Sequence, residues 1–224
     1  MSKGNQSQRA RHPEQKEERR QHLLATARAL LLDGLDVNAL GLNELARQAG
    51  MTKSNVYRYY ESREAVLLDV LEEELALWSA DFEHLSKQPL EKTHAIAELA
   101  KTYATTLVRR PLLCSLSSIL SSIIEHNISL ERVIEFKRRQ PILLGKIASA
   151  INAAAPTIKL EQVGEFIRLS VPLFVGLWPI SHPSAAVKKA ISLPELASLR
   201  YDFKRDLEHA LQIMLTGIVE NDKN

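Results

Sequence analysis

The chain has 224 residues, of which 45% are hydrophobic and 25% are charged, and its formal net charge is only +2 at pH 7. This length suits one sizeable domain or two small ones, and so small a net charge excludes no class of partner. The single cysteine, Cys114, excludes an intrachain disulfide and a zinc site built from several cysteines, and the histidines show no close ligand spacing. We therefore expect no metal site and no cofactor.

The N-terminus, the hydropathy and the cysteine content of the chain favour a cytoplasmic protein without a membrane partner. The N-terminus is polar and lacks the apolar core of a signal peptide. The longest mostly apolar run, residues 171–180, is too short to span a bilayer. A lone cysteine is also typical of a reducing compartment.

The first part of the chain is more basic than the rest. Residues 1–63 carry a net charge of +4 and the remaining residues carry −2, which fits contact with nucleic acid at one end. Residues 1–15 lack hydrophobic periodicity and predict a disordered basic arm, which can lie along a DNA groove or simply be solvated. Leucines and alanines then recur at helical spacing over 17–32, and Gly34 is placed to end that helix.

Residues 42–63, LNELARQAGMTKSNVYRYYESR, predict two short helices joined by a tight turn. We expect the first over 42–48, with Gly50 in the left-handed conformation that ends it. Thr52 is expected to cap the second, over 53–60. A helix-turn-helix of this kind places its second helix in the major groove of DNA, although the same pattern also occurs as plain packing in all-helical proteins.

The candidate DNA-binding residues share hydrogen-bonding side chains in or beside these helices: Asn43, Thr52, Lys53, Ser54, Asn55, Tyr57, Arg58, Tyr59 and Arg63. Phosphate contacts are assigned to Lys53, Tyr57, Tyr59 and Arg63. Base reading is assigned to Ser54, Asn55 and Arg58. Ser62 is expected to cap a third helix, whose N-terminus would bind a phosphate together with Arg63.

The ordered string A-x-x-A-G-M-T-K-S-x-V-Y-R-Y-Y-x-S-R-E, which begins at Ala46, is more specific than a generic two-helix pattern. It resembles the tetracycline-repressor (TetR) family of transcriptional regulators, and the likeness spans about residues 19–68. Gly41 stands where the family often has a Thr or Ser cap, and Tyr59-Tyr60 stands where His-Phe is more usual. The resemblance implies an all-α protein with a three-helix helix-turn-helix domain over 16–63. A helical ligand-binding and dimerisation domain is expected to follow over 64–224.

The rest of the chain predicts helix after helix and no sheet, because no alternating Val/Ile-rich segment with turn signals occurs. A long helix is expected over 62–87, with residues 72–74, three glutamates, on its solvated side. Further helices are expected over 91–109, 111–126, 129–153, 160–180 and 195–220. The segment 179–194 is expected to be an exposed loop.

The family resemblance implies that the body encloses a cavity for a small, often apolar, effector. The candidate ligand-binding residues are Trp78, Phe82, Tyr103, Cys114, Ser118, Phe174 and Trp178. The rings can wall a cavity or be ordinary core, and the serines over 115–122 can line a cavity or allow close helix packing. The thiol is expected to be structural rather than a sensor. No charged residue stands out as buried, so we expect a neutral or apolar effector.

The last two helices are expected to form a homodimer interface as a two-fold four-helix bundle. One apolar stripe comprises Val163, Phe166, Ile167, Ser170, Phe174, Leu177 and Trp178. The other comprises Leu196, Leu199, Phe203, Leu207, Ala210, Leu211, Met214 and Ile218. The alternative is that each stripe faces only the core of its own subunit.

The expected function is that of a ligand-responsive, sequence-specific transcriptional regulator and not of an enzyme, since no catalytic motif occurs. We expect a repressor that a small molecule releases from a pseudo-palindromic, double-stranded DNA operator; repression is the commoner mode in the family. One alternative is a dimeric DNA-binding regulator without a ligand. The other is an all-helical enzyme or carrier that does not bind DNA.

Overall fold

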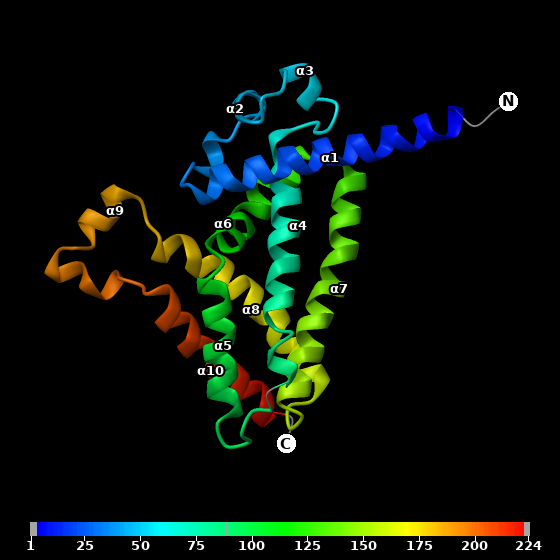
Figure 1. Cartoon of the computed structure of the whole chain (residues 1–224). Coiled ribbons are helices and arrows are strands. Elements are labelled where there is room, and N and C mark those ends of the chain that lie inside the picture. Colours follow the sequence, from blue (N-terminus) through cyan, green and yellow to red (C-terminus); the bar gives the residue numbers. More distant parts are fainter. Residues whose placement is uncertain (1–3, 88, 222–224) are drawn as a thin grey trace.

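The computed structural model describes the backbone of residues 4–87 and 89–221, and these residues contain helices and no strand, as predicted. The N-terminal head consists of α1 (Gly4–Leu32), α2 (Leu42–Gln48) and α3 (Lys53–Val56), with a short 3-10 turn at Val37–Ala39. Helix α4 (Arg63–Asp81) runs from the head down through the body (Figure 1). The all-α fold with a helix-turn-helix head and a helical body is confirmed.

The body surrounds the lower part of α4 with helices from the rest of the chain (Figure 1). These helices are α5 (Ala95–Val108), α6 (Pro111–Ile119), α7 (Leu130–Ala154), α8 (Leu160–Ser181), α9 (Ala185–Ala190) and α10 (Phe203–Asn221). A π-helical turn at Leu120–Ile124 and a 3-10 turn at Glu125–Asn127 continue α6 toward α7. Further 3-10 turns lie at Leu85–Lys87 and Pro194–Leu199.

The first helix begins earlier than the sequence predicts. Helix α1 starts at Gly4 and projects beyond the head (Figure 1), whereas we expected no regular structure before about residue 16. Its first half contains several Gln, Glu and Arg residues, which are strong helix formers. A helix that is polar on all sides has no hydrophobic periodicity, so periodicity alone does not predict it. Residues 1–3 lie outside the described residues, and contact between this arm and DNA stays a prediction.

Four predictions about elements of the head and body are wrong. Helix α3 ends at Val56 and continues as a tighter turn, in which the Tyr59 backbone N–H donates to the Val56 carbonyl at 2.9 Å. Helix α4 ends at Asp81, and a separate turn follows at Leu85–Lys87. The expected exposed loop contains α9, which Ser184 caps, and the last helix begins only at Phe203.

The two stripes assigned to a dimer interface face the core of their own subunit over most of their length. On α8, Val163 and Phe166 are fully buried within the single chain, and on α10 so are Leu207 and Leu211. Helix α8 packs against α6, α7 and α10, and α10 also packs against α5. The buried residues of both stripes therefore pack within their own subunit, and a dimer interface through the last two helices stays a prediction.

Helix α8 is long and apolar enough to cross a membrane by length and composition, as is the bent pair formed by Ala95–Val108 and Pro111–Asn127. The apolar segment of α8 is thus longer than we predicted. Helix α8 packs against three other helices of the body, and 33% of its apolar window is buried inside the chain.

Candidate nucleic-acid interface and ligand cavity

The helices of the head are held by a small apolar core. Leu23 of α1, Leu45 of α2 and Val56 of α3 are fully buried, and Tyr60 is 3% exposed. The turn between α2 and α3 depends on Gly50, whose φ of +64° lies in the left-handed region that favours glycine. These contacts fix the orientation of α3 on the outside of the head.

Helix α3 starts where the sequence predicts. The Thr52 hydroxyl accepts a hydrogen bond from the Asn55 backbone N–H at 3.4 Å and caps the helix. Gly41 precedes α2 and offers no side-chain cap, as its lack of a side chain requires. The capped first turn of α3 begins at Lys53 and lies on the protein surface, where Lys53 and Ser54 are exposed.

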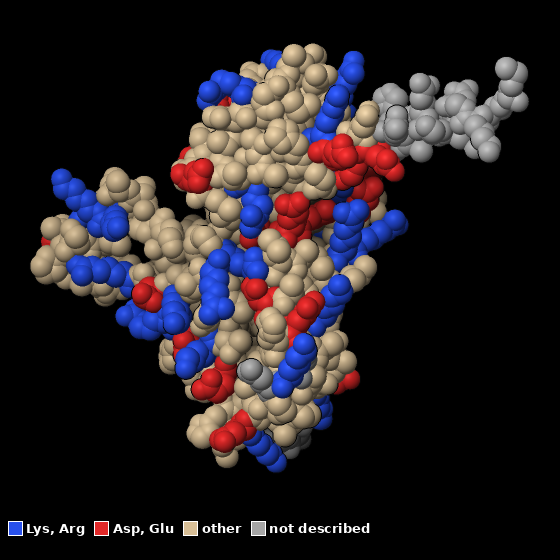
Figure 2. Space-filling view, in the orientation of Figure 1, with Lys and Arg blue, Asp and Glu red and all other residues tan. Residues whose placement is uncertain are grey.

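A face rich in hydrogen-bond donors lies on the outside of α3. The Lys53, Ser54, Tyr57 and Arg58 side chains are exposed, and so are those of Asn43 and Thr52. The Lys53 ammonium lies 5.8 Å from the centre of the Tyr57 ring, and the Tyr57 residue is 50% exposed. Asn55 and Tyr59 are half-buried beside them. Figure 2 shows basic side chains at this end of the molecule, where α2 and α3 lie.

Arg63 is held by the protein more firmly than the sequence suggests. Its guanidinium donates to the Asn38 carbonyl at 2.9 Å and to the Glu64 carboxylate at 2.8 and 3.1 Å. The predicted cap of α4 is present, since the Ala65 backbone N–H donates to the Ser62 hydroxyl at 3.1 Å. Arg63 therefore fastens the start of α4 to the head, and only the rest of its guanidinium is left for a phosphate.

Buried carboxylates on α4 join the head to the body. Asp69, 3% exposed, accepts hydrogen bonds from Arg20 of α1 and from Arg132 of α7. Glu74, 2% exposed, pairs with Arg28 of α1 at 2.7 Å and with Arg110 at 3.6 Å. The expectation that residues 72–74 form a solvated side was thus wrong for Glu74. No spacing in the sequence marks these pairs, because each arginine is far from its carboxylate along the chain.

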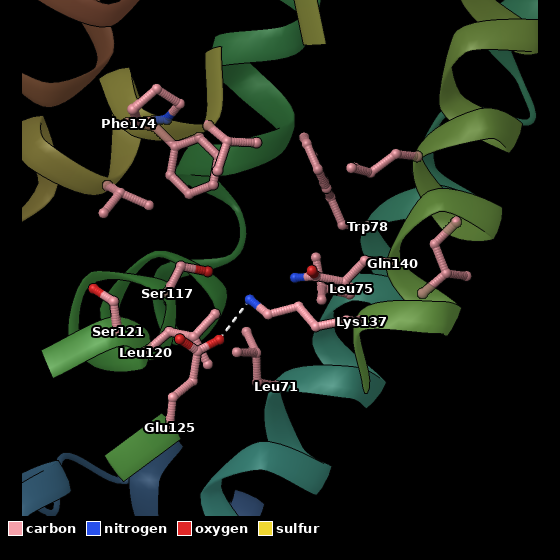
Figure 3. Close-up of a pocket in the computed structure, with 15 residues that line it drawn as sticks. Leu71, Leu75, Trp78, Ser117, Leu120, Ser121, Glu125, Lys137, Gln140 and Phe174 are labelled. Carbon is pink, nitrogen blue, oxygen red and sulfur yellow. Dashed lines mark ion pairs between the residues drawn. The ribbon is translucent and has the colours of Figure 1, made fainter. Parts of the chain in front are cut away.

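A cavity of about 290 Å³ lies between α4, α6, α7 and α8 (Figure 3). Its apolar lining consists of Leu71, Leu75, Trp78, Leu120, Leu143, Leu144, Val171, Pro172, Phe174 and Val175. Its polar lining consists of Ser117, Ser121, Glu125, Lys137 and Gln140. Of the candidate ligand-binding residues, only Trp78 and Phe174 lie in this wall.

The other candidate ligand-binding residues lie elsewhere in the core. Phe82 and Tyr103 are fully buried, their ring centres 5.6 Å apart, and the Tyr103 hydroxyl lies 2.6 Å from that of Ser170. Ser118 donates to the Ser115 carbonyl at 2.7 Å rather than facing the cavity. Trp178 stacks on the ring of His182 at 3.8 Å and lies edge-on to Phe203. These rings and this hydroxyl serve packing.

Cys114 is also a core residue. Its side chain is fully buried, and its thiol lies 3.6 Å from the Leu107 carbonyl. Burial raises the pKa of the thiol far above its usual range, because the thiolate would lose its hydration. A structural thiol, as expected from the sequence, agrees with this environment.

The polar wall of the cavity contains an ion pair that sequence reasoning missed. The Lys137 ammonium of α7 lies 2.5 Å from the Glu125 carboxylate (Figure 3). The side chains of Lys137 and Glu125 are 48% and 24% exposed, so the pair lies at the edge of the cavity. The two residues come from separate elements, and their charges alone gave no sign that they meet beside an apolar space.

One segment touches both the cavity and the head. Ser121 and Glu125 line the cavity, and the chain then continues to the start of α7. There the Ser62 hydroxyl donates to the Asn127 carbonyl at 3.0 Å, and the Ser129 backbone N–H donates to the Glu61 carboxylate at 3.1 Å. The π-helical turn within this segment is a rare element that is frequent at functional sites.

Comparison with known proteins covers both parts of the chain. Residues 23–70 match the family model of bacterial regulatory proteins of the tetR family, and residues 72–221 match that of the tetracyclin repressor-like C-terminal domain. No curated protein matches the sequence significantly.

Solved structures share the fold at low sequence identity. A TetR transcriptional regulator from Rhodococcus sp. RHA1 is 17% identical, with a TM-score of 0.56 over 90% of this chain and 96% of that one. The fatty acid degradation regulator FadR from Bacillus halodurans is 10% identical, with a TM-score of 0.52 over 89% and 95%. A putative TetR-family regulator from Mesorhizobium loti MAFF303099 is 13% identical, with a TM-score of 0.52 over 92% and 96%. The chain belongs to the TetR family of ligand-responsive, DNA-binding transcriptional regulators, which are not enzymes.

Proposed function

We propose that the protein is a homodimeric cytoplasmic repressor that binds a pseudo-palindromic operator and leaves it when a small molecule enters the cavity between α4, α6, α7 and α8. The observation that carries this proposal is the segment 120–129, which lines the cavity and is hydrogen-bonded to the start of α4. It gives the cavity a direct mechanical connection to the DNA-binding head.

The exposed face of α3 is proposed to enter the major groove. Lys53 and Tyr57 lie side by side on that face and are assigned to phosphates, together with Tyr59. Ser54 and Arg58 are exposed and, with the half-buried Asn55, are assigned to base edges. Asn43 and Thr52, both exposed, are assigned to the flanking backbone, and Arg63 is assigned a phosphate contact alongside its ties to the head.

A homodimer through α8 and α10 would use the faces that the core leaves free. Leu160 and Ile180 of α8 are 50% and 48% exposed, and Ile213 of α10 is 60% exposed. Two such pairs of helices can form a two-fold four-helix bundle. The dimer would hold two α3 helices one DNA turn apart, about 34 Å or a multiple of it, which explains a pseudo-palindromic site.

Release follows from the hydrogen bonds between segment 120–129 and the head. A ligand that contacts Ser121 or Glu125 shifts this segment, and the shift reaches Glu61 and Ser62 at the start of α4. Because α4 carries the head, its movement changes the spacing of the two α3 helices. A coupling free energy of about 1–3 kcal/mol between the two sites is enough for useful regulation.

The first test is enrichment of fragmented genomic DNA on the purified protein, followed by sequencing. A few pseudo-palindromic sites should be enriched. Lys53→Ala should weaken binding to them and, because it removes one phosphate contact, lower the slope of log affinity against log salt by about 1. The matched control is Lys146→Ala, which removes an exposed lysine of α7 in the body. Uniform weak recovery of DNA, or an unchanged salt slope in Lys53→Ala, would refute the assignment.

A further inference from the structure

The polar side of the cavity has unused hydrogen-bonding capacity. In the described part of the chain, the side chains of Ser117, Ser121 and Gln140 make no hydrogen bond to protein. The Lys137 ammonium has three N–H donors, and its ion-pair partner within the described chain is the Glu125 carboxylate. Figure 3 shows Lys137 reaching across from α7 toward Glu125, with Ser117 and Ser121 on the facing wall. The cavity therefore presents hydrogen-bond donors to whatever enters it, and its hydroxyls and amide can also accept.

The charged side chains in the described lining of the cavity are Lys137 and Glu125, which form one ion pair. Lys137 begins a run of three basic residues on α7, 137–139. Arg139 is paired with Glu72 at 2.8 Å, but Arg138 is exposed and has no ion pair among the described residues. Glu125 is the only carboxylate in the described lining. A ligand anion can replace Glu125 as the partner of Lys137, whose ammonium has three N–H donors to offer it.

The remainder of the wall requires an apolar ligand body. Trp78 and Phe174 present rings to the cavity, and leucines of α4 and α7 complete that side. The volume of about 290 Å³ lies near the lower end of the range for ligand sites, which is roughly 300–1,000 Å³. A small molecule with an apolar body and one polar group at its end matches this division of the lining.

We propose that the effector is an amphipathic monocarboxylic acid, whose carboxylate takes Lys137 from Glu125 and accepts hydrogen bonds from Ser117 and Ser121. This inference rests on the proposed function of the cavity and replaces the neutral effector expected from the sequence. The exchange requires water to reach the Glu125 carboxylate, whose side chain is 24% exposed and whose Oε1 atom is buried in the ion pair. The displaced carboxylate would also move the segment that contacts the head.

The test is calorimetric titration of the full chain with decanoate, decanol and decylamine below their micelle concentrations. Decanoate should bind more tightly than decanol, and decylamine should bind most weakly. Lys137→Gln should weaken the affinity for decanoate by roughly tenfold to a hundredfold, the range expected for a charge-assisted hydrogen bond. The same variant should leave the affinity for decanol unchanged. Glu125→Gln should increase the affinity for decanoate because it removes the carboxylate that competes for Lys137. The matched control, Lys146→Gln, lies on the same helix outside the cavity lining and should change nothing.

Three results would refute a carboxylic acid as the ligand: decanol that binds as tightly as decanoate, an affinity for decanoate that Lys137→Gln does not change, or no binding of decanoate. A circular dichroism melt of each variant shows that it is folded, so loss of binding is not confused with loss of structure. The DNA enrichment needs no added acid. If operator sites are enriched but decanoate does not bind, only the proposal that the effector is a carboxylic acid is refuted. If decanoate binds but no DNA is enriched, only the proposed repressor function is refuted.

Discussion

Replacing Asp69 by asparagine should weaken the junction between head and body more than any exposed ion pair could. Asp69 is 3% exposed and binds arginines of α1 and α7 at once, so the neutral amide leaves two guanidinium groups without their shared carboxylate. Asparagine has nearly the same shape, so packing is preserved and the effect reports on charge. The same substitution also leaves Arg20 and Arg132 close to each other, which adds repulsion.

The magnitude follows from how well the two arginines can be rehydrated. Removing one partner of a buried ion pair costs about 3–5 kcal/mol. The Arg20 and Arg132 side chains are 31% and 23% exposed, and each keeps a second carboxylate partner, Glu17 at 3.2 Å and Glu135 at 2.6 Å, so both remain partly compensated in the variant. We therefore expect the lower end of that range, about 3 kcal/mol, which for a chain of this length lowers the Tm by about 6–12 °C.

Urea unfolding followed by circular dichroism at a fixed protein concentration measures this change. The control is Glu165→Gln, because Glu165 pairs with Arg168 at 3.8 Å and both side chains are more than half exposed. That variant should lie within about 0.5 kcal/mol of the parent protein. A loss of less than about 1 kcal/mol in Asp69→Asn would show that Asp69 does not fasten α1 to α7 and would refute the reasoning.

Three further predictions concern single residues. Gly50→Ala should destabilise the protein by about 1–2 kcal/mol in urea unfolding, because Gly50 has a φ of +64°, and Gly50→Asn should cost less. Cys114 should not react with a thiol reagent at neutral pH until the protein unfolds, because burial raises its pKa; rapid labelling of the native protein would contradict this. Hydrogen bonds from Arg47 and Gln48 lower the pKa of Glu44 to about 2, which NMR titration of its carboxyl should show, and Arg47→Ala should raise it. The stabilisation from Glu44 should be present above its unfolded pKa, near the ordinary value of 4.5, and be lost as pH falls toward 2.

The head could be predicted largely from local sequence. A few neighbouring residues determine the cap at Thr52 and the left-handed conformations of Gly34 and Gly50. The structure confirms all three. Val56 and Tyr60 lie four residues apart, which is one helical face, and both are buried. Local signals of this kind also gave the approximate helices of the body, since each helix follows from its own periodicity.

The cavity could not be predicted, because its lining comes from helices that are distant along the chain. Ser118 was chosen where Ser117 faces the cavity, and one residue along a helix turns a side chain by about 100°. Periodicity locates an apolar face but does not say whether a neighbouring helix or a space lies against it. For that reason Phe82 and Tyr103, which are ordinary core, looked the same in sequence as Trp78, which lines the cavity.

Buried ion pairs also link the helices of the head to the helix that carries Lys137 of the cavity wall. Asp69 and Glu74 fasten α4 to α1 of the head, and Asp69 also fastens it to α7, which carries Lys137 of the cavity wall. Such pairs are weak evidence for stability, since their desolvation offsets much of their attraction, but they restrict which arrangements of helices are allowed. In the proposed mechanism, a ligand that moves α7 must therefore either carry α4 and the head along or break a buried ion pair, whereas segment 120–129 acts on the head through its hydrogen bonds to Glu61 and Ser62. Because breaking one costs more than a typical coupling free energy, movement of the head is the response with the lower free energy.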